Sequence, residues 1–247
     1  MATHTAVAGH GEHAEHTEHA HTALAHHFDN LEQQREAGAL GMWVFIAQEV
    51  MFFGGLFLAY LVYRLQYPNA FMAASNHLDW GLGTFNTAVL ITSSLTMALA
   101  VWATQVGKSR KVQVGFMVAT MLLGLVFLGV KAYEYAEKYK DGLIPIAGWF
   151  DPVGKGHIPM PEGVTVGQYQ MFYWLYFAMT GLHALHMIIG VAILLPIMWW
   201  AWRGRYSPEY HAPVENFGLY WHFVDIIWIF LFPLLYLLGA HFGSGTH

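Results

Sequence analysis

The stretch WHFVDIIW at residues 221–228 places an acidic residue, Asp225, inside the last of five long apolar segments. An ionisable residue within a membrane-spanning helix costs about 2.5 to 3.5 kcal/mol on insertion scales, so it usually faces other protein and has a polar partner. Trp221, Asp225 and Trp228 fall at i, i+4 and i+7, and His222 is three residues before Asp225. This spacing predicts a helix with one polar and aromatic face.

The composition indicates an integral membrane protein. Hydrophobic residues make up 56% of the 247 residues and charged residues 11%, whereas soluble domains have about 25% charged residues. A membrane span needs about 20 mostly apolar residues. The sequence therefore predicts an all-α bundle of five membrane helices in one domain, near residues 40–63, 81–106, 112–134, 170–202 and 217–240.

The basic residues of the connections indicate the orientation of the bundle, because cytoplasmic loops carry an excess of lysine and arginine. One side of the predicted bundle carries Arg35, Lys108, Arg110, Lys111, Arg203 and Arg205. The other side carries Arg64, Lys138, Lys140 and Lys155, offset by Asp141, Asp151 and Glu162. The bias predicts that the N-terminus lies inside and the C-terminus outside.

The segments that flank the bundle differ from it in composition. Residues 1–27 hold eight of the sixteen histidines and little to bury, so we expect a disordered cytoplasmic tail. Weak binding of a transition metal is the alternative for this tract. The spacing of Leu24, Phe28 and Leu31 predicts a short amphipathic helix at the membrane surface over residues 28–39. The main domain then covers residues 40–240, and residues 241–247 form a short outside tail.

Further ionisable residues lie within or at the ends of the other spans. Glu49 is near the middle of the first span, and Glu134 is one turn after Lys131, which could neutralise it. His183 and His186 are at i, i+3 on one face of the fourth span. These are the candidate site residues, together with Trp221, His222, Asp225 and Trp228.

Several kinds of chemistry fit these residues poorly. The absence of cysteine excludes disulfides, thiolate-bound zinc, iron–sulfur clusters and blue-copper centres. Neither Glu49 nor Glu134 has the Glu-x-x-His spacing of di-iron helix bundles. Axial ligation of a haem by histidines remains an alternative to histidines hydrogen-bonded within the bundle or holding lipid headgroups. The chain has no recognisable repeat of the kind found in transporters, and its net charge of −5 gives no reason to expect nucleic acid.

Five strings, in order along all five spans, resemble subunit III of the haem–copper oxidases, most closely cytochrome c oxidase subunit III of bacteria. They are FIAQEVMFF at 45–53, FNTAVL at 85–90, KAYEY at 131–135, TGLHALHMIIG at 180–190 and YWHFVDIIW at 220–228. Mitochondrial-type members have two further helices before the buried glutamate. This chain resembles the five-helix bacterial form, in which subunit I carries the extra pair and would complete the family's lipid cleft.

The resemblance implies a non-redox subunit of an aerobic oxidase in the bacterial cytoplasmic membrane. In this family the haems and haem–copper centre belong to subunit I and the dinuclear copper site to subunit II, so no cofactor is expected in this chain beyond structural phospholipid. The implied work is to stabilise subunit I, hold lipid and support proton supply. The implied partners are oxidase subunits I and II, membrane phospholipid, and cytochrome c or another electron donor, with a larger respiratory supercomplex as a further candidate.

The resemblance also suggests roles for single residues. Glu49 matches the family's buried, carbodiimide-reactive carboxylate, for which a proton-related role is implied; a neutral acid hydrogen-bonded across helices is the alternative. The residues that match the polar interior, where lipid headgroups or inter-helix hydrogen bonds are expected, are Glu134, His183, His186, His222 and Asp225. Trp221 and Trp228 would pack there or against acyl chains. No residue is expected to be catalytic or to bind metal.

Three other functions remain open at this point. Subunit III of a quinol oxidase shares the helix strings and differs in the electron donor. An accessory subunit of nitric oxide reductase has similar strings. A free-standing proton-coupled membrane protein is the alternative of another class, and it predicts function without any oxidase partner.

Overall fold

The computed structural model describes residues 28–237 except 147, 159 and 161. The described residues form helices and connections without strands. The helices are α2 (Leu31–Gln66), α3 (Pro68–Ser75), α4 (Trp80–Gln105), α5 (Arg110–Lys140), α6 (Val166–Trp202) and α7 (Ala212–Phe232), followed by the π-helical turn η1 (Pro233–Leu237). Five of these helical segments are long and apolar enough to cross a membrane. The prediction of an all-α bundle with five spans is confirmed.

The helix ends follow from local sequence. Asn30 accepts a hydrogen bond from the Gln33 backbone N–H at the start of α2, and Asp79 caps α4 in the same way. Thr165 and Gln168 form a reciprocal capping box at the start of α6. Such caps satisfy backbone N–H groups that have no partner within the helix. The boundaries of the long helices therefore depend on side chains next to the apolar segments.

The first span differs from the prediction in length. Helix α2 has 36 residues and begins at Leu31. Most of the segment 28–39, which was predicted to be a separate short helix, is therefore the first part of this long helix. Its position at a membrane surface stays a prediction. The short helix α3, which begins at Pro68, was not predicted from the sequence. The predicted tails at residues 1–27 and 241–247 lie outside the described residues.

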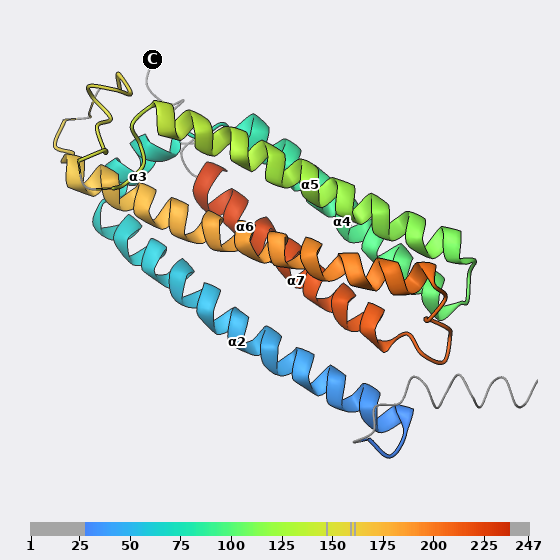
Figure 1. Cartoon of the computed structure of the whole chain (residues 1–247). Helices are drawn as coiled ribbons and strands as arrows, with labels where there is room; N and C mark the ends of the chain where they lie inside the picture. The colour runs from blue at the N-terminus through green and yellow to red at the C-terminus, as the bar shows by residue number, and fades with distance from the viewer. Residues whose placement is uncertain (1–27, 147, 159, 161, 238–247) are drawn as a thin grey trace, which may run out of the picture.

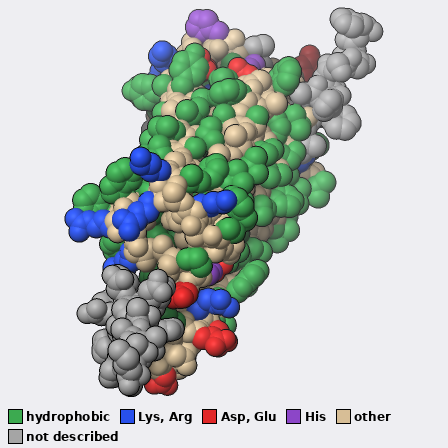
Figure 2. Space-filling view, turned by 90° about the vertical axis from the view of Figure 1, so that its right-hand side faces the viewer, with side chains coloured by type: hydrophobic (Ala, Val, Ile, Leu, Met, Phe, Trp, Pro, Cys, Tyr) green, Lys and Arg blue, Asp and Glu red, His purple; other side chains and the backbone are tan. Residues whose placement is uncertain are grey.

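The five long helices lie roughly side by side in one elongated bundle (Figure 1). The α4–α5 and α6–α7 connections and the start of α2 lie at one end, which we call the basic end. The connection containing α3 and the loop from 141 to 165 lie at the opposite end. Basic side chains gather at the basic end, and hydrophobic side chains cover most of the surface beyond it (Figure 2). This distribution is the one expected of a membrane bundle with charged ends.

Helix α7 is the centre of the bundle, and it packs against α2, α4 and α6. Trp221 fixes its approach to α5 and α6. A Cβ atom at Gly124 of α5 or at Gly190 of α6 would lie 3.0 Å from the Trp221 ring, a separation that leaves little room for a methyl group. Small residues let membrane helices pack closely, and here two glycines accommodate one buried indole.

Candidate functional site

The predicted site residues do not form one cavity. The structure divides them into three groups: a network around Glu134, a pair formed by Glu49 and His186, and a pocket beside His222 and Asp225. Among the described residues, no group of three histidine or acidic side chains could hold a metal ion.

The network around Glu134 connects α5, α6 and η1. Lys131 Nζ lies 2.8 Å from Glu134 Oε2 and donates to the hydroxyls of Tyr176 and Tyr236 at 3.2 and 2.9 Å. The same two hydroxyls donate to Glu134 Oε1 at 2.8 and 2.6 Å. Each ammonium hydrogen of Lys131 thus has an acceptor, and both carboxylate oxygens of Glu134 accept hydrogen bonds. Breaking one member would leave a buried charge unpaired.

Aromatic rings complete this network. Lys131 Nζ lies 5.1 to 5.6 Å from the ring centroids of Tyr135, Tyr176, Trp228 and Tyr236, which is within the range of cation–π attraction. Lys131 and Glu134 are each 2% exposed. Two roles were predicted for Glu134, inter-helix hydrogen bonding and binding of a lipid headgroup. This geometry favours inter-helix hydrogen bonding. The sequence indicated the lysine–glutamate pair, whereas the two tyrosine partners were not predicted.

The second group joins α2 to α6. Glu49 Oε2 lies 3.3 Å from His186 Nε2, and both side chains are largely buried. His186 Nδ1 lies 2.8 Å from the backbone oxygen of Leu182. Because a carbonyl oxygen only accepts, Nδ1 carries a hydrogen and donates it. The remaining nitrogen, Nε2, is the one that faces Glu49, but the contact lacks hydrogen-bond geometry, and Glu49 Oε2 has no hydrogen-bond partner among the described residues.

His183 and His186 separate, although they are only three residues apart. His183 is fully buried, packs between the rings of Phe127 and Trp228 at 5.3 and 5.2 Å, and its two nitrogens have no hydrogen-bond partner among the described residues. His186 points toward α2. Sequence spacing placed both on one side of the helix, but the positions of the neighbouring helices decide that His186 meets Glu49 while His183 meets Phe127 and Trp228.

The third group lies between α4 and α7. Ser94 Oγ is 2.6 Å from His222 Nδ1, and the two tryptophans of α7 also bond to hydroxyls of α4. Trp221 Nε1 donates to Ser93 at 2.8 Å and Trp228 Nε1 to Thr87 at 3.1 Å. The serine and threonine partners on α4 were not singled out from the sequence. They explain how the polar and aromatic face of α7 is accommodated inside the bundle.

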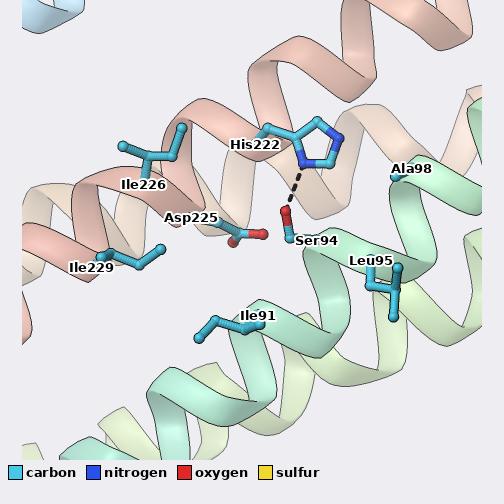
Figure 3. Close-up of a pocket in the computed structure, with 8 residues that line it drawn as sticks. All are labelled: Ile91, Ser94, Leu95, Ala98, His222, Asp225, Ile226 and Ile229. Carbon is cyan, nitrogen blue, oxygen red and sulfur yellow. Dashed lines mark hydrogen bonds between the residues drawn. The ribbon is translucent and has the colours of Figure 1, made fainter.

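Asp225 is the exception on this face. It is 2% exposed, and neither carboxylate oxygen has a hydrogen-bond partner among the described residues. It lines a pocket of about 240 Å³ with His222 and Ser94. Figure 3 shows Asp225 and His222 reaching from α7 toward Ser94 on α4, with Ile91, Leu95, Ile226 and Ile229 around them.

Comparison with known proteins identifies the family of the chain. The family model described as cytochrome c oxidase subunit III matches residues 19–140 and 164–240. This chain belongs to that family. The matched residues contain all five spans, so the resemblance seen in the five sequence strings is confirmed. Membership in the subunit III family makes the chain a component of a haem–copper oxidase.

Individual relatives include both kinds of oxidase. Cytochrome c oxidase subunit 3 of Thermostichus vulcanus is 31% identical over 88% of this chain and 94% of the relative. Cytochrome c oxidase subunit 3 of Synechocystis is 33% identical over 80% of this chain and 74% of the relative. A probable quinol oxidase subunit 3 of Staphylococcus aureus is 29% identical over 87% of this chain and 96% of the relative. The identities to the cytochrome c oxidase and quinol oxidase relatives differ too little to identify the electron donor of this chain's oxidase.

Proposed function

We propose that this chain is the non-redox subunit III of an aerobic oxidase that oxidises cytochrome c, reduces oxygen to water and translocates protons. The family match through all five spans carries the proposal. The chain has no cysteine, so it cannot provide the thiolates of a dinuclear copper site. The haems and copper would be held by subunits I and II, which are the proposed partners.

The proposed location is a bacterial cytoplasmic membrane with the basic end inside. Arg203 and Arg205 stack over Trp199 and Trp200, at 4.6 and 5.3 Å, and Lys108 lies 5.4 Å from the Trp102 ring. Paired aromatic and basic side chains suit the headgroup region, and the excess of basic residues suits the cytoplasmic side. Phospholipid bound at these helix ends is part of the proposal.

Purification of the intact assembly from native membranes tests the assignment. A reduced-minus-oxidised spectrum with haem signals, together with a haem–copper subunit I among the copurifying proteins, is expected. Copper-ligand cysteines in the accompanying subunit II and turnover with reduced cytochrome c would establish the donor. Turnover with quinol alone would instead favour the quinol oxidase alternative, which the Staphylococcus aureus relative supports. A colourless chain without oxidase partners would contradict the proposal.

Within this function we propose that Glu49 and His186 support proton supply by sharing one proton. His186 Nδ1 donates its hydrogen to the Leu182 carbonyl, so Nε2, which lies 3.3 Å from Glu49 Oε2, is the ring nitrogen available for proton exchange with the carboxyl group. Glu49→Gln and His186→Gln are each expected to lower proton uptake or to speed inactivation during turnover. Both variants should retain the spectrum of the assembly. If turnover, proton uptake and inactivation are all unchanged, the pair has only a packing role.

A further inference from the structure

The two connections at the basic end form one charged surface. A Cβ atom at Gly204 would overlap the Arg110 guanidinium, and one at Gly107 would lie 3.0 Å from the Pro208 ring, so the connections touch. Figure 2 shows basic side chains gathered at this end. Five exposed cations lie on or beside the connections, and we call them the basic patch: Lys108, Arg110, Lys111, Arg203 and Arg205.

The charges of the basic patch are not neutralised within the bundle. Among the described residues, none of the five cations forms an ion pair with an acidic side chain. Lys108, Arg203 and Arg205 lie over tryptophan rings, a contact that attracts a cation but leaves its charge uncompensated. Glu209 is the acidic residue of the α6–α7 connection. A surface of this kind attracts an anionic partner.

The N-terminal tail, residues 1–27, carries the opposite charge at neutral pH. It contains Glu12, Glu15 and Glu18, one in each of three successive Glu-His-x triplets, and no aspartate, lysine or arginine. Three glutamates give its side chains a net charge of −3 when the eight histidines are neutral, and eight histidinium charges less three give +5. A free histidine titrates near pH 6.5, so the charge of the tail reverses around that pH.

The tail joins the bundle at the same end as the basic patch. Phe28, which follows the tail, lines a pocket of about 470 Å³ together with Tyr210 of the α6–α7 connection. Glu18 is ten residues before Phe28, and ten extended residues span up to about 33 Å. The start of α2 carries Asp29, Glu32, Arg35 and Glu36. Its net negative charge repels an acidic segment, which leaves the basic patch as the attractive surface within reach.

We infer that residues 12–21 of this chain bind across the basic patch near neutral pH and leave it when their histidines are protonated. The glutamates supply anions for exposed cations that have no acidic partner. Because the tail is tethered, it competes with anions from solution at an effective concentration of about millimolar. Protonation replaces this attraction by repulsion between like charges. The inference does not depend on the oxidase function, and it makes the tail a pH-controlled competitor of the phospholipid headgroups proposed at these helix ends.

Cross-linking from the tail identifies its partner, since the chain has no cysteine of its own. Thr17→Cys, labelled with benzophenone maleimide in the intact assembly in lipid nanodiscs, is expected to form adducts with peptides of the two connections at about pH 7.5. Val153→Cys, at a side chain that is 54% exposed at the opposite end, measures the background. Adducts of the tail with phospholipid only, or with another subunit only, would overturn the inference.

Substitution of the glutamates tests whether charge holds the tail in place. Glu12→Gln, Glu15→Gln and Glu18→Gln, combined in the Thr17→Cys chain, should lower the yield of adducts with the connections by about fivefold at neutral pH. Glu162→Gln, which removes an acidic residue at the opposite end, should leave the yield unchanged. An equal yield in the triple variant and its control would contradict an electrostatic contact.

The pH dependence tests the release. Lowering the pH from about 7.5 to about 5.5 should decrease the adduct yield of the Thr17→Cys chain by a similar factor. The histidine variant, which should lose most of this decrease, carries His13→Gln, His16→Gln, His19→Gln and His21→Gln. Glu209 and His211 of the α6–α7 connection are present in both chains, so the difference reports the tail alone. A yield independent of pH, or a decrease that persists in the histidine variant, would overturn the pH-dependent release.

Discussion

Helices α7 and α2 are both apolar enough to cross a membrane, yet they occupy opposite environments. In the most apolar window of each, 61% of the α7 segment is buried inside the bundle and only 17% of the α2 segment. The α7 helix contains Trp221, Asp225 and Trp228, whereas the buried residues of α2 are Glu49, Phe53 and Tyr60. Hydropathy therefore identifies a span but does not show whether lipid or protein surrounds it.

The physical difference lies in how the polar atoms are satisfied. On α7 the indole N–H groups donate to hydroxyls on α4, which fixes the rotation of one helix against the other. On α2 the buried carboxyl of Glu49 contacts a single histidine, and long stretches of the helix face outward. We expect substitutions on α7 to affect stability more than matched substitutions on α2.

The largest contrast should come from the tryptophans. Trp221→Ala removes a fully buried indole that lies between Gly124 and Gly190, and it should lower the free energy of unfolding by about 4 kcal/mol. Trp43→Ala on α2 is the matched control, because Trp43 is 60% exposed. The midpoint of thermal unfolding of the detergent-solubilised assembly measures both. Similar shifts for the two variants would contradict the difference between the helices.

The second largest effect on stability is expected from substitutions in the network around Glu134. Lys131→Met leaves Glu134 buried without its cation and should destabilise the assembly by about 3 kcal/mol. Lys131→Met combined with Glu134→Gln removes both charges and should recover a large part of this loss. The same unfolding measurement applies. Additive losses in the double variant would show that the two side chains act independently.

The glycines allow a finer comparison. Gly124→Ala and Gly190→Ala place a methyl group 3.0 Å from the Trp221 ring and should cost about 1 to 2 kcal/mol through overpacking. Gly55→Ala on α2 meets no atom within 4 Å and should stabilise its helix by about 0.5 kcal/mol. The unfolding midpoint is therefore expected to fall for Gly124→Ala and Gly190→Ala and to rise for Gly55→Ala. A loss of stability in all three variants would show that α2 is covered as closely as α7.

The smallest effect concerns His77, which lies outside the spans in the turn between α3 and α4. Burial, and then the charge of Lys138, lowers the pKa of His77 below its usual 6.5, while Asp141 acts in the opposite direction. As the pH falls below about 6.5, the unfolded chain binds more protons at this site than the folded protein, so stability decreases until the folded histidine is also protonated.

The readout for His77 is the pH dependence of the unfolding midpoint. His77→Gln should reduce the decrease in the midpoint on going from about pH 7.5 to about pH 5.5, the window in which a free histidine titrates. The effect should be small because the His77 side chain is exposed, and solvent weakens the interactions that shift its pKa. An unchanged pH dependence would assign the decrease to other groups.

Sequence reasoning recovered much of the architecture and less of the site. It predicted five spans, because each is a long apolar run, and the common position of the basic connections, because spans alternate in direction. It also identified the string that contains Glu49 and the two strings that contain the histidines. It missed α3, which is too short to have a clear period, and the hydroxyls of Ser93 and Thr87, which are ordinary residues in any membrane helix.

The amino-acid order by itself determined that this chain is a five-helix membrane protein of the subunit III family, because apolar length and linear strings are local properties. Only the tertiary structure decided that His186 meets Glu49 while His183 is enclosed by rings, and that Glu134 is fully paired while Asp225 is not. The physical reason is that the partner of a polar atom depends on the rotation and separation of neighbouring helices. Those are determined by packing, here by one tryptophan held between two glycines.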